Sequence, residues 1–320
     1  MVFLRIIGYN NVLKHMNADH RLSVPQQGKS RIPELKKGDV FLMIKKNRMI
    51  GTAVCALITA MTLTACVQVN VNTAEAAAAD RESVNQVSLL QGLTFGDYNG
   101  SRSAGEVKSM GDIGIGTFDA LNGELIMLDG VIYRAAGDGS VEAVDDSETI
   151  PFCDVTWFDS DESETITDIQ DIASLKEVLD KKVSELGTNR FYFIRIDGKF
   201  KEMNVRSELA QTEPYKPLAK VLETDQTFFD YSDIDGTVVG LYCPDYMDRL
   251  NAVGWHFHFI SDDREKGGHM LDLKFDSGEL KWDYTDGFSM ILPENEMFSD
   301  FDLTVDQSED IRRVETGDGE

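Results

Sequence analysis

Hydrophobic positions between residues 171 and 187 repeat with the spacing of one helix face. The apolar residues of this stretch are Ile172, Leu175, Val178, Leu179, Val183 and Leu186. Steps of three or four positions place these side chains on one side of an α-helix, and Gly187 provides a C-terminal stop. Ser103 followed by Glu106 forms a capping-box pattern for a shorter helix that Gly111 ends. We therefore expect few helices, of which the one over 172–186 is the clearest.

Other apolar runs have the character of strands. Asp129-Gly130 separates two such runs in ELIMLDGVIYRA, and Asp197-Gly198 does so in FYFIRIDGKFKEM. Asp-Gly favours the positive φ angles of a type I′ turn, so each segment predicts a β-hairpin. The expected fold class is α/β, with β-rich mixed-sheet architecture, few helices and two subdomains at about 89–205 and 206–320.

A third hairpin carries candidate metal chemistry. In GWHFHFISDDREKGGH, His256 and His258 alternate with Trp255, Phe257 and Phe259. Residues two apart on a strand share a face, so the two imidazoles project together and the aromatic rings project to the other side. An antiparallel register whose paired numbers sum to an odd value, such as 258 opposite 269, adds His269 to the same face. A one-residue slip would turn it away.

These three histidines are the only ones after Cys66. Three imidazoles suit zinc, iron, nickel or copper, and three protein ligands leave coordination positions open, as catalytic sites do. No histidine is left to activate a serine or cysteine nucleophile, and no Gly-x-Ser-x-Gly segment occurs. The pattern predicts a metal-binding β-hairpin.

The first 88 residues differ from the rest of the chain. From Met43, a basic start, the uncharged run Met49–Ala65 and the ending LTAC are similar to a bacterial lipoprotein signal peptide over 43–66. We expect Cys66 to be lipidated, which predicts an extracytoplasmic, membrane-anchored or secreted protein. Residues 1–42 are interpreted as an untranslated or non-functional extension, and residues 67–88 as a flexible tether before the catalytic domain at 89–320.

The charge balance limits the possible partners. The chain holds 31 basic and 56 acidic residues, of which ten and three lie in residues 1–66, so the remainder carries a formal charge of −32. Such a surface repels phosphates, and we expect no nucleic-acid partner. After Cys66 only Cys153 and Cys243 remain, which we interpret as two buried thiols rather than a disulfide.

Four blocks together resemble α-acetolactate decarboxylase. They are GIGTFDALNGELIMLDGVIYRAAGDGSV, PFCDVTWF, FYFIRIDGKF with EPYKPL, and GWHFHFISDDREKGGH. The resemblance spans about residues 89–320 and implies an exported, homodimeric carboxy-lyase. It also implies zinc held by His256, His258 and His269. The polar residues around the metal would be Glu124 in LNGELI, Arg206 in NVRSELAQTEPYKPL, Glu315 in RRVE and Thr117 in GTF.

The implied reaction converts (S)-2-acetolactate to (R)-acetoin and carbon dioxide through a metal-stabilised enediolate. The residue types suit this reaction. A metal can stabilise the negative charge, a guanidinium can hold the carboxylate and a carboxyl group can move the proton. Two alternatives are a cupin-type metalloenzyme, which shares His-x-His and a later histidine, and a non-catalytic metal-capturing lipoprotein. Acetoin formation from acetolactate separates these hypotheses.

Overall fold

The computed structural model describes residues 81–307 and 310–311. The helices are α2 (Leu90–Phe95), α3 (Ala104–Lys108), α4 (Ile172–Leu186), α5 (Leu218–Val221) and α6 (Glu296–Asp300), with short 3-10 turns at Asp119–Leu121 and Asp245–Met247. The strands are β1 (Ser83–Val87), β2 (Arg102–Ser103), β3 (Ile113–Thr117), β4 (Glu124–Leu128), β5 (Val131–Ala135), β6 (Val141–Ala143), β7 (Thr149–Ile150), β8 (Phe152–Thr156), β9 (Glu162–Ile169), β10 (Phe191–Glu208), β11 (Gln226–Cys243), β12 (Gly254–Ser261), β13 (Gly267–Thr285) and β14 (Gly287–Ile291). Among the described residues, no helix is both long enough and apolar enough to span a bilayer.

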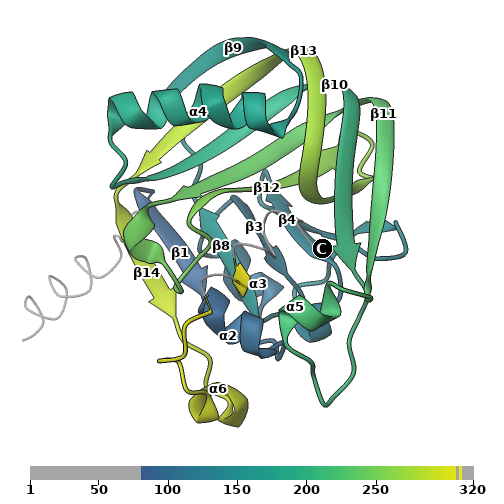
Figure 1. Cartoon of the computed structure of the whole chain (residues 1–320), viewed down its shortest axis with the longest axis vertical. Helices are drawn as coiled ribbons and strands as arrows, with labels where there is room; N and C mark the ends of the chain where they lie inside the picture. The colour runs from purple at the N-terminus through teal and green to yellow at the C-terminus, as the bar shows by residue number, and fades with distance from the viewer. Residues whose placement is uncertain (1–80, 308–309, 312–320) are drawn as a thin grey trace, which may run out of the picture. The chain divides into compact units, whose positions relative to one another are not determined.

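The first sheet has seven strands in the order β14-β1-β8-β3-β4-β5-β6 (Figure 1). Strands β1 and β14 run parallel and the other pairs are antiparallel, so the expected mixed sheet is confirmed. The β4–β5 connection is the Asp129-Gly130 turn, with φ of 51° and 78°. These positive values are what Asp-Gly was expected to supply.

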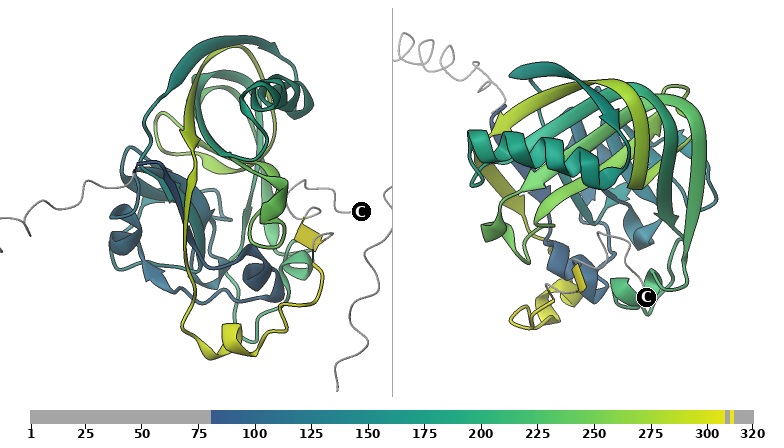
Figure 2. Two further views of the ribbon diagram at one scale, coloured as in Figure 1. Left: turned by 90° about the vertical axis from the view of Figure 1, so that its left-hand side faces the viewer. Right: turned by 45° about the horizontal axis from the view of Figure 1, so that its top comes forward.

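The second sheet contains β9 to β13, and four of these strands pair in a closed cycle. Strand β10 pairs with both β11 and β13, and β12 pairs with both of these. The curl of the long strands is visible in both views of Figure 2. Helix α4 buries Leu175, Leu179 and Val183 in the same apolar cluster as residues of these strands, as its spacing predicts. Val178 and Leu186, which the spacing puts on the same face, are 38% and 39% exposed.

The expected hairpin at Asp197-Gly198 is wrong. Both residues lie inside β10, an 18-residue strand, and Gly198 pairs with Gly236 on one side and Gly278 on the other. A Cβ on Gly198 would come within 3.3 Å of the Cα of Gly278, so this row of glycines lets three strands cross closely. Pairing with β11 and β13 thus keeps this segment extended, although its sequence favours a turn.

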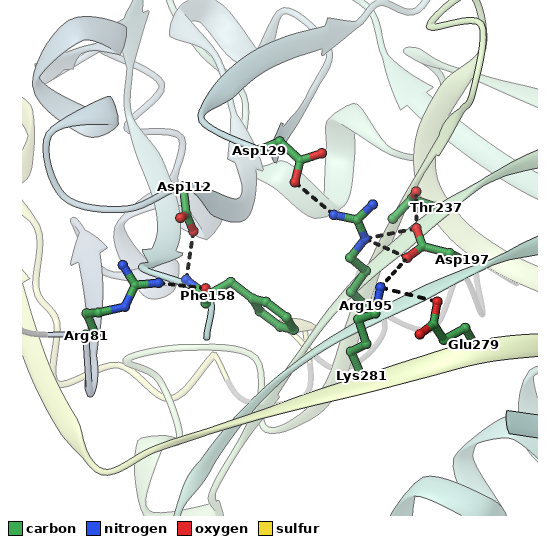
Figure 3. A network of polar contacts seen from close by, with 9 residues as sticks. All are labelled: Arg81, Asp112, Asp129, Phe158, Arg195, Asp197, Thr237, Glu279 and Lys281. Carbon is green, nitrogen blue, oxygen red and sulfur yellow. Dashed lines mark hydrogen bonds and ion pairs between the residues drawn. The ribbon is translucent and has the colours of Figure 1, made fainter. Parts of the chain in front are cut away.

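Apolar and polar contacts join the two sheets. Ile113, Ile115 and Ile126 of the first sheet share one core cluster with Phe193 and Ile260 of the second. Figure 3 shows a polar link beside it. Arg195 of β10 donates to Asp129 in the β4–β5 turn at 2.8 Å and to both carboxylate oxygens of Asp197 at 2.8 and 2.9 Å, and Lys281 lies 3.4 Å from Asp197.

Two expected boundaries differ from the structure. The segment 67–88 was interpreted as a tether, but β1 lies within it, with Val84 and Val87 fully buried. Because β1 pairs with β8 and β14, the residues from Ser83 onward are part of the fold. The expected division between 205 and 206 falls inside β10. The extension 1–42, the signal peptide 43–66 and Glu315 lie outside the described residues.

Candidate metal centre

The three histidines meet on the β12–β13 hairpin. His258 pairs directly with His269, so the odd-sum register is confirmed. Nε2 of His256 lies 3.1 Å from Nε2 of His258 and 3.1 Å from Nδ1 of His269. One ligand atom from each residue lies within 4.8 Å of the other two. Trp255, Phe257 and Phe259 pack in the core cluster that also contains residues of α4, as the alternation predicts.

Burial favours the neutral form of His256 and His258. His256 is 8% exposed, His258 0% and His269 3%. Desolvation lowers the pKa of His256 to about 3, with a smaller contribution from the positive charge of Arg206. Desolvation likewise lowers the pKa of His258 well below its usual range. Neutral imidazole is the form that binds a metal, so the nitrogens are ready to do so at neutral pH.

A backbone carbonyl of the first sheet orients one of the rings. Nδ1 of His258 lies 2.8 Å from the carbonyl oxygen of Leu125. Because a carbonyl only accepts, we assign the proton to Nδ1, which leaves the lone pair of Nε2 directed toward the other two histidines. Three buried nitrogens that converge with one tautomer fixed in this way are a donor set that fits zinc or a similar divalent ion.

Glu124 and Thr117 come from the first sheet. They pair across β3 and β4, and Oε2 of Glu124 lies 3.3 Å from Nε2 of His258. The Thr117 hydroxyl donates to the carbonyl oxygen of Gly123 at 2.8 Å, which secures the turn leading into Glu124. Both side chains are buried, at 5% and 4% exposed. The structure thus brings both predicted residues to the histidines.

Arg206 comes from β10 of the second sheet, where it pairs with His269. It is 3% exposed, and its Nε lies 3.9 Å from Oε1 of Glu208. Arg195, an earlier arginine of the same strand, belongs instead to the link between the sheets. Glu208 was missed by the sequence analysis. The available signal was its position two residues after Arg206, which puts both side chains on one strand face.

These residues line a small cavity of about 40 Å³. Its polar wall contains Thr117, Glu124, Arg206, Glu208, His256 and His269. Its apolar wall contains Leu90, Leu93, Leu121, Phe152 and Leu218, which belong to the same core cluster as Ile311 near the C-terminus. The cavity can therefore hold a small anion by its charged end and exclude water along its apolar side.

Comparisons with known proteins agree with this geometry. The family profile for alpha-acetolactate decarboxylase matches residues 84–305. The alpha-acetolactate decarboxylase of Methanosarcina mazei is 36% identical over 230 residues, which cover 72% of this chain and 79% of that protein. The Brevibacillus brevis protein of the same name is 31% identical over 286 residues, covering 85% and 99%. The crystal structure of the Bacillus subtilis strain 168 protein superposes with a TM-score of 0.70 at 32% identity and covers 73% of this chain and 99% of that one. The chain therefore belongs to the alpha-acetolactate decarboxylase family, a family of carboxy-lyases.

Proposed function

We propose that this protein decarboxylates (S)-2-acetolactate to (R)-acetoin and carbon dioxide with zinc held by His256, His258 and His269. The observation that carries the proposal is the convergence of these three buried imidazoles, whose ligand atoms lie within 4.8 Å of one another. Two of them, His256 and His269, line a cavity together with Arg206 and Glu124. Membership of the family supports the substrate, because the relatives are named for it.

Zinc bound there would supply a Lewis acid that stabilises the negative charge left when carbon dioxide departs. Three protein nitrogens leave coordination positions open for the substrate oxygens. The neutral imidazoles add no charge of their own. The divalent charge is therefore not diminished by its ligands, as it would be by carboxylates or thiolates.

Arg206 is the residue that we assign to the substrate carboxylate. Its side chain is only 4% exposed, and buried charge-assisted hydrogen bonds are among the strongest available. The leucines of the opposite wall would contact the methyl groups and keep water out. Arg206 at one end of the cavity and the apolar wall along its side would orient the substrate and the bond to be broken.

Glu124 is the residue that we assign to proton transfer. Loss of carbon dioxide leaves an enediolate carbon that must receive a proton, and delivery from one side yields a single enantiomer. Glu124 lies 3.3 Å from His258 and is 5% exposed, so it can hold a proton beside the metal without exchange with bulk water. Thr117 supports it by fixing the preceding turn. Glu315 is proposed as a further carboxyl group of the site.

The test is zinc content together with acetoin formation from acetolactate. His256→Ala, His258→Ala and His269→Ala should each lower bound zinc from about one per chain to near zero and abolish acetoin formation. Asp262→Ala, at an exposed position in the same hairpin, is the matched control and should retain both. Stoichiometric zinc in any of the histidine variants would remove that residue from the ligand set.

A further inference from the structure

A second carboxylate lies in the same cavity and has no part in the chemistry assigned above. Glu208 is 4% exposed and lines the cavity with Arg206, His256 and His269. Its Oε1 lies 3.9 Å from Nε of Arg206. Its Oε2 is buried and has no hydrogen-bond partner among the described residues. A buried carboxylate oxygen in this state is costly, which points to an electrostatic role for Glu208.

The position of Glu208 suggests what that role is. Arg206 and Glu208 line the same cavity and lie side by side. A ligand with one carboxylate can pair with the guanidinium of Arg206. A ligand with two carboxylates brings its second negative charge close to the carboxylate of Glu208 in a water-poor cavity, which is unfavourable.

We propose that Glu208 is a specificity-determining residue that makes the cavity select singly charged carboxylates over dicarboxylates. This inference rests on the proposed function, because it takes Arg206 as the residue that holds the substrate carboxylate. The ion pair with Arg206 places the negative charge of Glu208 beside the guanidinium that would hold the substrate carboxylate. A second negative group on the ligand therefore meets repulsion from Glu208 in addition to losing water.

The test compares two anions that differ by one charge. The probes are 2-hydroxy-2-methylbutanoate, with one carboxylate, and 2-hydroxy-2-methylbutanedioate, in which a second carboxylate replaces the terminal methyl group. Binding of each to the zinc-loaded protein is measured by calorimetry, so turnover is not needed. Glu208→Gln keeps the shape and removes the charge. It should shift the affinity ratio toward the dicarboxylate by at least about tenfold, equivalent to about 1.4 kcal/mol.

The ratio of the two probe affinities in each variant is divided by the same ratio in the parent protein. Chelation of the metal by either probe contributes equally to parent and variant, so it cancels. Glu202→Gln makes the same substitution at an exposed position of β10 and should leave the ratio unchanged. Glu208→Met, neutral and of similar size, gives a second reading should the glutamine variant not fold.

The outcome separates this inference from the proposed function. A ratio that moves no further in the Glu208 variants than in Glu202→Gln would overturn the specificity role, even if the parent forms acetoin. A parent that binds zinc but forms no acetoin from acetolactate would refute the proposed function, while the binding ratio would still test Glu208.

Discussion

At the scale of single residues, burial controls how the carboxyl groups behave. Asp283 of β13 is 2% exposed, and desolvation is the main cause that raises its pKa from 3.8 to about 7. The backbone N–H of Asp159 opposes the shift by donating to Asp283 at 3.3 Å, whereas the negative charges of Asp161, Glu82 and Asp159 add to it. This aspartate therefore accepts a proton near neutral pH when the protein is folded.

The raised pKa of Asp283 predicts a stability change with pH. Between about pH 4 and 7 the folded protein holds a proton that the unfolded chain has released, so this residue makes the protein less stable as pH rises through that range. Asp283→Asn should raise the melting temperature at pH 8 and have little effect near pH 3, where Asp283 is largely protonated in both the folded and the unfolded state. Asp276→Asn, exposed on the same strand, is the control for thermal denaturation. An equal gain at both pH values would contradict this linkage.

Glu315 gives a second prediction at this scale. It lies outside the described residues, four positions after Ile311, which is 5% exposed and packs in the cluster containing the cavity leucines. If Glu315 acts at the metal, Glu315→Gln should lower turnover at least about tenfold with zinc content and melting temperature unchanged, because only a charge and a titratable proton are lost. A chain ending at Arg313 should behave similarly. Turnover within about twofold of the parent for both variants would exclude the residue from catalysis.

At the scale of elements, the β12–β13 hairpin depends on a change of register in β13. Val205 pairs with Met270, but Asn204 pairs with Asp272, so Leu271 is an extra residue on β13. A bulge of this kind changes which face the following side chains occupy. It lets Leu273 and Met270 both pack in the core while His269 stays on the face of His258. The metal site is thus compatible with the core only because of this irregularity.

Gly268 provides a test of this close packing. Its φ is 151°, and a Cβ at this position would lie 2.6 Å from the carbonyl oxygen of Arg206. Gly268→Ala should therefore separate β10 from β13 beside Arg206 and His269, weaken zinc binding at least about tenfold and destabilise the fold by about 1–3 kcal/mol. Zinc affinity and denaturant unfolding measure the two effects.

Gly187→Ala is the matched control for Gly268→Ala. Gly187 also has a positive φ, of 122°, but a Cβ there would meet nothing within 4 Å. The control therefore reports the cost of backbone strain without the steric contact. Unchanged zinc affinity in Gly268→Ala would show that strand spacing at this point does not hold the site.

At the scale of the whole molecule, the site is assembled by both sheets. The histidines and Arg206 belong to the second sheet, whereas Glu124 and Thr117 belong to the first. The contact between His258 and the carbonyl oxygen of Leu125 crosses the interface directly. The apolar cluster between the sheets and the link through Arg195 and Asp129 (Figure 3) hold these parts together. Metal binding should therefore be sensitive to how the sheets pack.

Export is the remaining prediction for the whole chain, and it rests on the sequence alone. If Cys66 is the lipidation site, expression in a bacterial host should place the protein in the membrane fraction, and Cys66→Ser should prevent lipid attachment. Intact-mass measurement of the mature N-terminus gives the answer. A chain that begins at Met1 without acyl mass would contradict both the expected start site and the expected location.

Local pattern alone was enough for several features. The face of α4, its extent from Ile172 to Leu186, the Asp129-Gly130 turn and the common direction of His256 and His258 depend on side-chain spacing and φ preferences within a few residues. The same alternation showed that only an odd-sum register could bring in His269, and the structure decided that this register forms. The resemblance in four blocks named the family that the comparisons confirm.

Contacts between distant strands decided the rest. Asp197-Gly198 has the same letters as Asp129-Gly130, yet it continues a strand because β11 and β13 flank it on both sides. The register change at Leu271 and the place of Glu208 beside Arg206 likewise depend on which strands pair and how the sheets close. Pairing partners of β10 and β13 lie up to 94 positions apart in the chain, as in Phe191 with Thr285, so no local spacing rule could specify them. The free energy of these strand pairings is gained only once the sheets have formed.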